Sequence, residues 1–94
     1  MIVGAASAST QIKLKGDVFL EKNQIFLKDI AVVKSDNKRF ESFLKQIFIK
    51  PFPESRYVEK VYPKDIKDAL KKNYIDTSNI QITGNYVVVK RKLK

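Results

Sequence analysis

The sequence has 94 residues, and its 19 Lys and Arg residues against 10 Asp and Glu residues give a formal net charge of +9. It contains no His and no Cys, which excludes an imidazole general base, a Ser-His-Asp triad, a thiol nucleophile and a disulfide framework. This length suits one small domain, and a hydrophobic fraction of 44% indicates that it folds. We therefore predict a non-enzymatic domain without a cofactor or a metal ion.

The positive charge has two interpretations. It could attract an acidic partner, such as nucleic acid, anionic lipid or an acidic protein. It could also be a solvated, Lys-rich surface. Sixteen of the basic residues are Lys, spread along the chain, and three are Arg. Because the planar guanidinium of Arg is preferred for specific phosphate and base recognition, this composition favours the solvated surface.

The first residues, MIVGAASAST, are small, apolar and uncharged. Ala6-Ser7-Ala8 fits the small-x-small pattern of a signal-peptidase site, although a basic start and a longer apolar core are missing. Residues 1–10 are therefore either the remnant of a secretory signal or a cloning remnant, and we exclude them from the fold. No run approaches the roughly 20 apolar residues that span a bilayer, so no membrane insertion is expected.

The first half of the chain predicts two strands and a helix. Residues 11–20 alternate between apolar and polar positions, which is typical of a strand, with a bulge or turn at Gly16-Asp17. After a polar break, residues 25–27 resume as a strand that Lys28-Asp29 ends, and residues 30–33 form an apolar run that should be largely buried. Residues 35–37 can then cap a helix. Its apolar face is expected to contain Phe40, Phe43, Leu44 and Ile47.

The second half predicts a strand, a helix and a hairpin. Residues 48–50 leave the first helix as a short extended segment, and 51–53 form a stiff connector. A strand over 57–62 precedes a second helix that begins at Pro63 and stops at Asn73. The apolar face of this helix is expected to contain Ile66, Ala69, Leu70 and Tyr74. Residues 81–83 and 86–90 are predicted to pair as a hairpin around Gly84-Asn85.

Together these elements predict a small α+β domain over residues 11–92. The expected order is β–β–α–β–α–β–β, with a mixed or antiparallel sheet and two short helices.

Few residues are candidates for chemistry. Asp65 and Asp68 are three apart on the second helix among Lys residues, and we interpret them as surface charge. The basic end, residues 90–94, lies near Tyr86 and Tyr57 in a pattern that could hold a nucleic-acid strand, but a charged strand end or linker is favoured. Phe52, between two prolines, could plug the core or anchor a partner, and the core is favoured. Phe52 and Tyr57 are the candidate partner-contact residues.

An ordered series of motifs resembles the N-terminal domain of the FlgA family of flagellar basal-body P-ring formation proteins. The series covers nearly all of residues 11–92, and no single motif is diagnostic. Its pieces are a hydrophobic-Leu-x-Asp-Ile-Ala element at 26–31, a Pro-containing segment at 47–53, a basic-aromatic strand at 56–62, a helix with Ile-x-x-Ala-Leu within 65–70, Tyr-Ile-Asp at 74–76, and Ile-x-Ile-x-Gly closing on Val-x-Val-x-Arg within 80–91. The chain departs from the family at Lys28, at Asn73-Tyr74 and at the bulky segment 52–55.

The resemblance implies a non-enzymatic assembly chaperone of the periplasm that acts on the flagellar P-ring subunit. Relatives have a further SAF (β-clip) domain after this one, so the resemblance implies that this chain is the N-terminal domain of a longer protein. It would support that second domain, or present an edge strand or an apolar patch to the ring subunit.

Two alternatives stay open. The first is a small basic nucleic-acid-binding domain, which would bind DNA or RNA with a steep salt dependence. The second is an exported domain of a related SAF-containing assembly protein from a pilus or secretion system. Neither the oligomeric state nor the partner-binding surface follows from the sequence.

Overall fold

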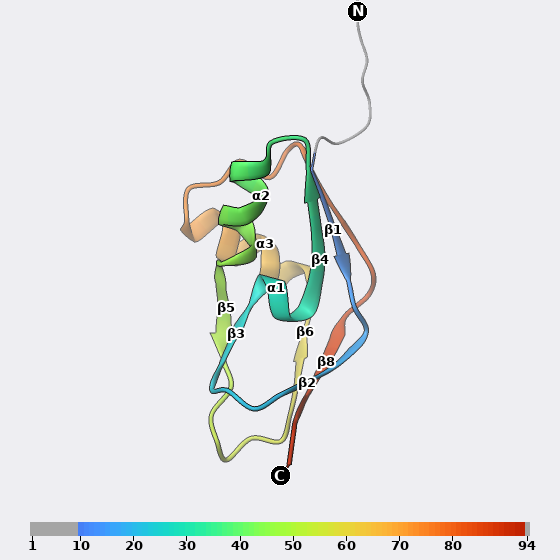
Figure 1. Cartoon of the computed structure of the whole chain (residues 1–94), viewed down its shortest axis with the longest axis vertical. Coiled ribbons are helices and arrows are strands. Elements are labelled where there is room, and N and C mark those ends of the chain that lie inside the picture. Colours follow the sequence, from blue (N-terminus) through green and yellow to red (C-terminus); the bar gives the residue numbers. More distant parts are fainter. Residues whose placement is uncertain (1–9, 94) are drawn as a thin grey trace, which may run out of the picture.

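The computed structural model describes residues 10–93, which form an α+β domain of eight strands and three short helices (Figure 1). The elements in chain order are β1 (Thr10–Leu14), β2 (Asp17–Leu20), β3 (Gln24–Phe26), α1 (Leu27–Ile30), β4 (Ala31–Ser35), α2 (Lys38–Lys45), β5 (Phe48–Pro51), β6 (Val58–Val61), α3 (Pro63–Lys72), β7 (Ile80–Thr83) and β8 (Val87–Arg91). The predicted fold class is confirmed. The fold begins at least one residue earlier than expected, because Thr10 is buried in β1 and its hydroxyl donates to Ser35 Oγ at 2.9 Å. Residues 1–9, where the leader was predicted, lie outside the described residues.

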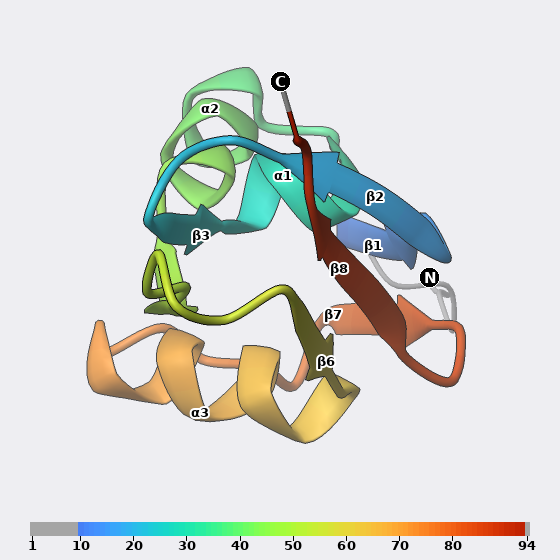
Figure 2. The same ribbon diagram turned by 90° about the horizontal axis from the view of Figure 1, so that it is seen from below.

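Two bent arms of the chain organise the sheets. In the first arm β1 leads into β2, and in the second β7 leads into β8. The arms run parallel, because β1 pairs with β7 and β2 pairs with β8. Each arm leaves the sheet β4-β1-β7 and enters the sheet β2-β8-β6, while β3 and β5 form a separate antiparallel pair (Figures 1 and 2).

This pairing overturns the predicted hairpin around Gly84-Asn85. β7 and β8 belong to different sheets, and their partners are the two halves of the first arm. Gly84-Asn85 instead form the bend at which the chain passes from the sheet of β7 to the sheet of β8. Gly84 has a φ of +112°, and a Cβ at this position would lie 2.8 Å from Leu14 Cβ on the neighbouring arm. Gly16, with a φ of +96°, makes the bend of the first arm, and its carbonyl accepts from Val88 N–H at 2.7 Å.

The segment after β3 also differs from the prediction. Residues 27–30 form the single-turn helix α1, where only the end of a strand was expected. Asp29 Oδ2 accepts from Phe26 N–H at 2.9 Å and pairs with Lys22 Nζ at 2.8 Å, so its side chain satisfies a backbone donor at the helix start. The apolar run at 30–33 is only partly buried. It enters β4, where side chains alternate, and Val32 is therefore 45% exposed.

Both longer helices begin with a side-chain cap. Asn37 Oδ1 accepts from Arg39 N–H and Phe40 N–H at the start of α2, as predicted. Asp65 Oδ2 accepts from Tyr62 N–H at the start of α3, and Pro63 occupies its first turn.

The apolar faces of these helices are narrower than predicted. α2 ends at Lys45, and Phe43 is 51% exposed rather than buried. α3 ends at Lys72 with Asn73 as its C-cap, the predicted stop, after which Tyr74 takes a φ of +59° and is 98% exposed. Tyr74 follows the end of α3, where the chain direction changes, so the helical period no longer describes where its side chain points. Phe43 lies inside α2, so its exposure shows that the buried face of this helix is narrow.

One core joins the three sheets and the helices. Its fully buried large side chains are Phe52, Ile12, Ile25, Leu27, Ile30, Leu44, Ile66 and Leu70, together with Val61, Val87 and Val89.

Candidate functional site

The two predicted contact residues have opposite environments. Phe52 is completely buried, so its prediction as a partner contact is wrong, and the favoured core role is confirmed. The Arg91 guanidinium carbon lies 4.1 Å from the centre of its ring. Tyr57 is 61% exposed beside β6 and stays a prediction as a contact residue.

The basic C-terminal end is tied into the fold through Arg91. Its Nη2 donates to the carbonyl oxygens of Phe52 and Pro53 at 2.8 and 2.6 Å. Its Nη1 donates to the carbonyl oxygens of Glu21 and Lys22 at 3.1 and 2.9 Å. The guanidinium thus joins the end of β8 to two loops, and its donors are already engaged.

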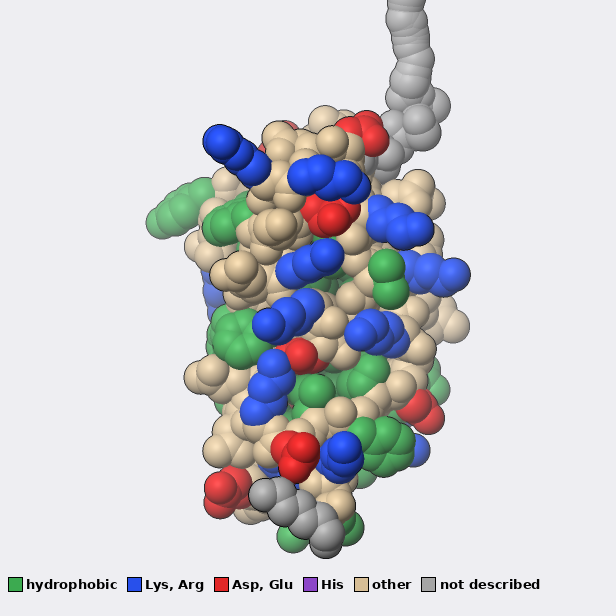
Figure 3. Space-filling view, in the orientation of Figure 1, with side chains coloured by type: hydrophobic (Ala, Val, Ile, Leu, Met, Phe, Trp, Pro, Cys, Tyr) green, Lys and Arg blue, Asp and Glu red, His purple; other side chains and the backbone are tan. Residues whose placement is uncertain are grey.

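Arg56 is also engaged, since its Nη1 lies 2.8 Å from Glu59 Oε1. The Arg91 guanidinium is therefore not available to bind a phosphate group with two parallel hydrogen bonds, whereas Arg56 has one nitrogen in an ion pair and remains 56% exposed. The Lys side chains are instead spread over the surface, with hydrophobic side chains between them (Figure 3).

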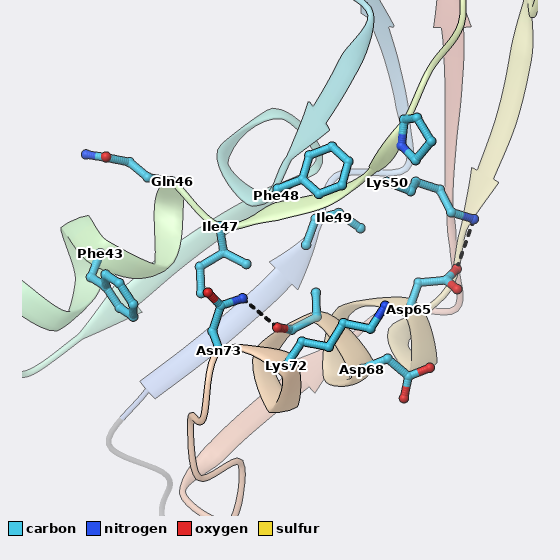
Figure 4. A pocket seen from close by; sticks show the side chains of 12 residues that line it. Phe43, Gln46, Ile47, Phe48, Ile49, Lys50, Asp65, Asp68, Lys72 and Asn73 are labelled. Carbon is cyan, nitrogen blue, oxygen red and sulfur yellow. Dashed lines mark hydrogen bonds and ion pairs between the residues drawn. The ribbon is translucent and has the colours of Figure 1, made fainter.

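A groove with a volume of about 720 Å³ lies between β5 and α3 (Figure 4). The end of α2 contributes one of its walls. The groove is lined by Phe43, Gln46, Ile47, Phe48, Ile49, Lys50, Pro51, Asp65, Asp68, Ala69, Lys72 and Asn73. Phe43 and Phe48 are 51% and 44% exposed, so apolar rings line an open surface there.

β5 presents one unpaired edge to this groove. Its other edge pairs with β3, and Phe52 N–H donates to Asn23 O at 2.8 Å at the end of that ladder. The β3–β5 ladder is irregular between Ile25 and Phe26, whose partners on β5 are Lys50 and Phe48. Ile49 lies in this irregularity and has no partner on β3. Within residues 10–93, β3 is the only strand paired with β5.

Both ends of the groove are held by side chains. At one end Lys50 reaches from β5 to Glu59 Oε2 at 3.2 Å and Asp65 Oδ2 at 3.6 Å (Figure 4). At the other end Asn73 Nδ2 donates to Ala69 O at 2.8 Å. Of these contacts, the ion pair between Lys50 and Asp65 joins β5 to α3, whereas the Asn73 bond closes the C-terminal end of α3 itself.

In the described part of the chain, no group of three or more acidic residues could hold a metal ion. Two carboxyl groups with lowered pKa values lie elsewhere. A backbone N–H from Ser35 lowers the pKa of Glu41, and a backbone N–H from Ser78 lowers the pKa of Asp76. Both bonds stabilise local turns.

The groove residues Phe43 and Phe48 were not predicted from the sequence. Phe43 was assigned to the buried face of α2, and Phe48 was only placed in an extended segment. The helical spacing gave Phe43 the same apolar-face position as Leu44, so it contained no signal that Phe43 is exposed.

Comparisons with known proteins identify the fold but no family. No family model matches the chain, and no curated protein matches it. A functionally unknown protein from Eubacterium ventriosum has a crystal structure that superimposes with a TM-score of 0.73 at 22% sequence identity, over 95% of this chain and 98% of that one. At this identity the likeness shows a shared α+β fold. Among residues 10–93, no helix has the length and apolar character needed to cross a membrane.

Proposed function

We propose that this domain is a non-enzymatic binding module that holds an extended polypeptide segment in the groove between β5 and α3. The observation that carries the proposal is the open edge of β5 beside the exposed rings of Phe43 and Phe48. An extended segment can add to a free strand edge through backbone hydrogen bonds, while its alternate side chains enter the groove.

We further propose that the bound segment belongs to the flagellar P-ring subunit, and that the protein is a periplasmic chaperone of P-ring assembly. The support for this partner is the ordered motif series that resembles the FlgA family. An assembly chaperone must cover apolar, strand-forming segments of its client before they pair with one another, and a preformed groove beside an open strand edge suits that task.

Binding to purified P-ring subunit tests both parts of the proposal. The double variant Phe43→Ala plus Phe48→Ala should weaken binding about tenfold or more, because aromatic anchors at the centre of an interface often contribute 2 kcal/mol or more. Tyr74→Ala is the matched control, since it removes an exposed ring outside the groove lining. Equal binding by the parent domain and both variants would exclude the groove as the binding site.

Single-stranded DNA at two salt concentrations distinguishes the alternative function. The net charge of +9 favours some association with any polyanion. Weak DNA binding that salt removes, together with saturable binding of the ring subunit, would support the chaperone. Tight DNA binding without any response to the ring subunit would replace the proposal with nucleic-acid binding.

A further inference from the structure

A second surface, separate from the groove, lies on the outer side of the sheet β2-β8-β6. Strand alternation places Val61, Val87 and Val89 in the core and turns their neighbours outward. β8 lies between β2 and β6 (Figure 2). We name the outward set the aromatic–basic face, and it consists of Phe19 from β2, Val58 and Lys60 from β6, Tyr62 just after β6, Tyr86 just before β8, and Lys90 from β8.

The strand registers bring these side chains together in rows. Phe19 is opposite Lys90 across β2 and β8, and Lys90 is opposite Val58 across β8 and β6. Tyr62 and Tyr86 are in contact, with ring centres 6.0 Å apart and planes tilted by 58°. The face is therefore one continuous patch rather than scattered apolar residues.

The apolar side chains of the face are exposed to an unusual degree. Phe19 is 61% exposed, Val58 52%, Tyr62 46% and Tyr86 44%. Apolar side chains scattered singly on a surface need no explanation, but a contiguous exposed group commonly marks an interaction site. Their exposure is not required by the fold, because the inner valines of the same strands already supply its core.

Two Lys residues give the aromatic–basic face a positive charge. Lys60 Nζ lies 5.1 Å from the centre of the Tyr86 ring, and Lys90 Nζ lies 5.7 Å from the centre of the Phe19 ring. Asp17 is a carboxylate at the edge of the face, and its Oδ2 lies 3.6 Å from Lys90 Nζ. Cations held against apolar rings are complementary to carboxylates that are interspersed with apolar side chains.

The spacing of the two cations matches an extended polypeptide. Lys60 pairs with Val88 and Lys90 pairs with Val58, so the Lys residues are diagonal neighbours on adjacent strands. Such neighbours have Cα atoms about 7–8 Å apart. Side chains at positions i and i+2 of an extended segment are about 7 Å apart and point the same way. Two acidic residues separated by one residue could therefore each meet one Lys.

We propose that the aromatic–basic face docks an acidic, extended protein segment in which Asp or Glu alternates with apolar residues. A protein is favoured over nucleic acid by two observations. Arg91 is engaged within the fold, and the faces of the Tyr86 and Phe19 rings are shared with Lys side chains. This inference stands on the sheet face and is independent of the groove.

The test uses a short synthetic peptide in which Glu alternates with Val and Phe, titrated against the full chain. The double variant Lys60→Glu plus Lys90→Glu should weaken binding at least tenfold and should gain binding to the same peptide with Lys in place of Glu. The matched control, Lys34→Glu plus Lys67→Glu, changes the net charge equally at exposed positions outside the face. It should retain most of the binding.

Four outcomes would overturn the proposal. These are equal losses in the two double variants, no binding of the acidic peptide, tighter binding of oligothymidylate than of the peptide, and tighter binding of vesicles containing anionic lipid. The groove variant Phe43→Ala plus Phe48→Ala should bind the acidic peptide normally. Failure of the groove proposal and failure of this one are thus distinguishable. A gain of binding to the basic peptide in the Lys60→Glu plus Lys90→Glu variant would establish that the face itself makes the contact.

Discussion

Replacement of Arg91 by Ala should destabilise the domain by about 4 kcal/mol. The three shortest guanidinium bonds, to the carbonyl oxygens of Pro53, Phe52 and Lys22, are 2.6, 2.8 and 2.9 Å long. At about 1 kcal/mol net for each bond they contribute about 3 kcal/mol, because water can partly replace the guanidinium at these carbonyl groups. The contact with the Phe52 ring at 4.1 Å adds about 1 kcal/mol. A loss of this size is a large part of the stability of a small domain.

Urea unfolding followed by circular dichroism measures this loss. With a denaturant slope of about 2 kcal/mol/M, the midpoint should fall by about 2 M. Arg91→Lys keeps the charge but not the planar fork, so most of the loss should remain. Arg39→Ala is the matched control, because Arg39 is exposed on α2. If Arg91→Ala and Arg39→Ala shifted the midpoint equally, the guanidinium would not join the loops in solution and the reasoning would fail.

Three further predictions follow from the core, the bends and one capped turn. Phe52→Ala should cost about 3–5 kcal/mol by leaving a cavity, whereas Tyr57→Ala should change thermal stability by less than about 0.5 kcal/mol; similar midpoints for the two would contradict the core role of Phe52. Gly84→Ala should lower the urea midpoint more than Gly16→Ala, because both need a positive φ but only Gly84 would place its Cβ 2.8 Å from Leu14. The pKa of Glu41 is lowered in the fold, so its contribution to stability is present above the unfolded pKa of about 4.3 and is lost as the pH falls through the folded pKa. Glu41→Gln should therefore flatten the acid limb of the stability curve, unlike Glu54→Gln; an unchanged acid limb would show that the bond to Ser35 N–H is not formed in solution.

Local patterns in the sequence predicted most of the elements. Alternation located β1 and β2, Asn37 marked the start of α2, and Pro63 marked the start of α3. These predictions succeeded because a cap or a strand period depends on a few neighbouring residues. The break at Gly16 was also correctly placed.

Strand pairing could not be predicted in the same way. Gly84-Asn85 has the composition of a hairpin loop, and local turn chemistry alone favours pairing of β7 with β8. The pairs that form instead join residues about 70 positions apart, such as Thr10 with Ile80 and Asp17 with Val88. What decides between them is the burial of both arms in one core, which no short window of sequence contains.

The same limitation explains why the aromatic–basic face was missed, although Tyr86 itself was named as a candidate for nucleic-acid contact. Phe19, Tyr62 and Tyr86 come from three separate segments, and only the registers of β2, β8 and β6 place them on one face. Phe52, by contrast, stood out locally between two prolines and proved to be core. An unusual local sequence thus indicated a rigid structural position, while the exposed surfaces depended on tertiary arrangement.

β6 connects the two proposed surfaces, since its alternating side chains face in two directions. Val58 and Lys60 point to the aromatic–basic face, and Glu59 points the other way to bind Lys50 at the end of the groove. Lys50 Nζ also lies 3.4 Å from the carbonyl oxygen of Lys60. A segment docked on the outer side of β6 therefore leaves the groove open, and one partner could occupy both surfaces with two segments. Because linked segments bind the second surface at a high effective concentration, two individually weak contacts would suffice to hold an assembly subunit and still release it stepwise.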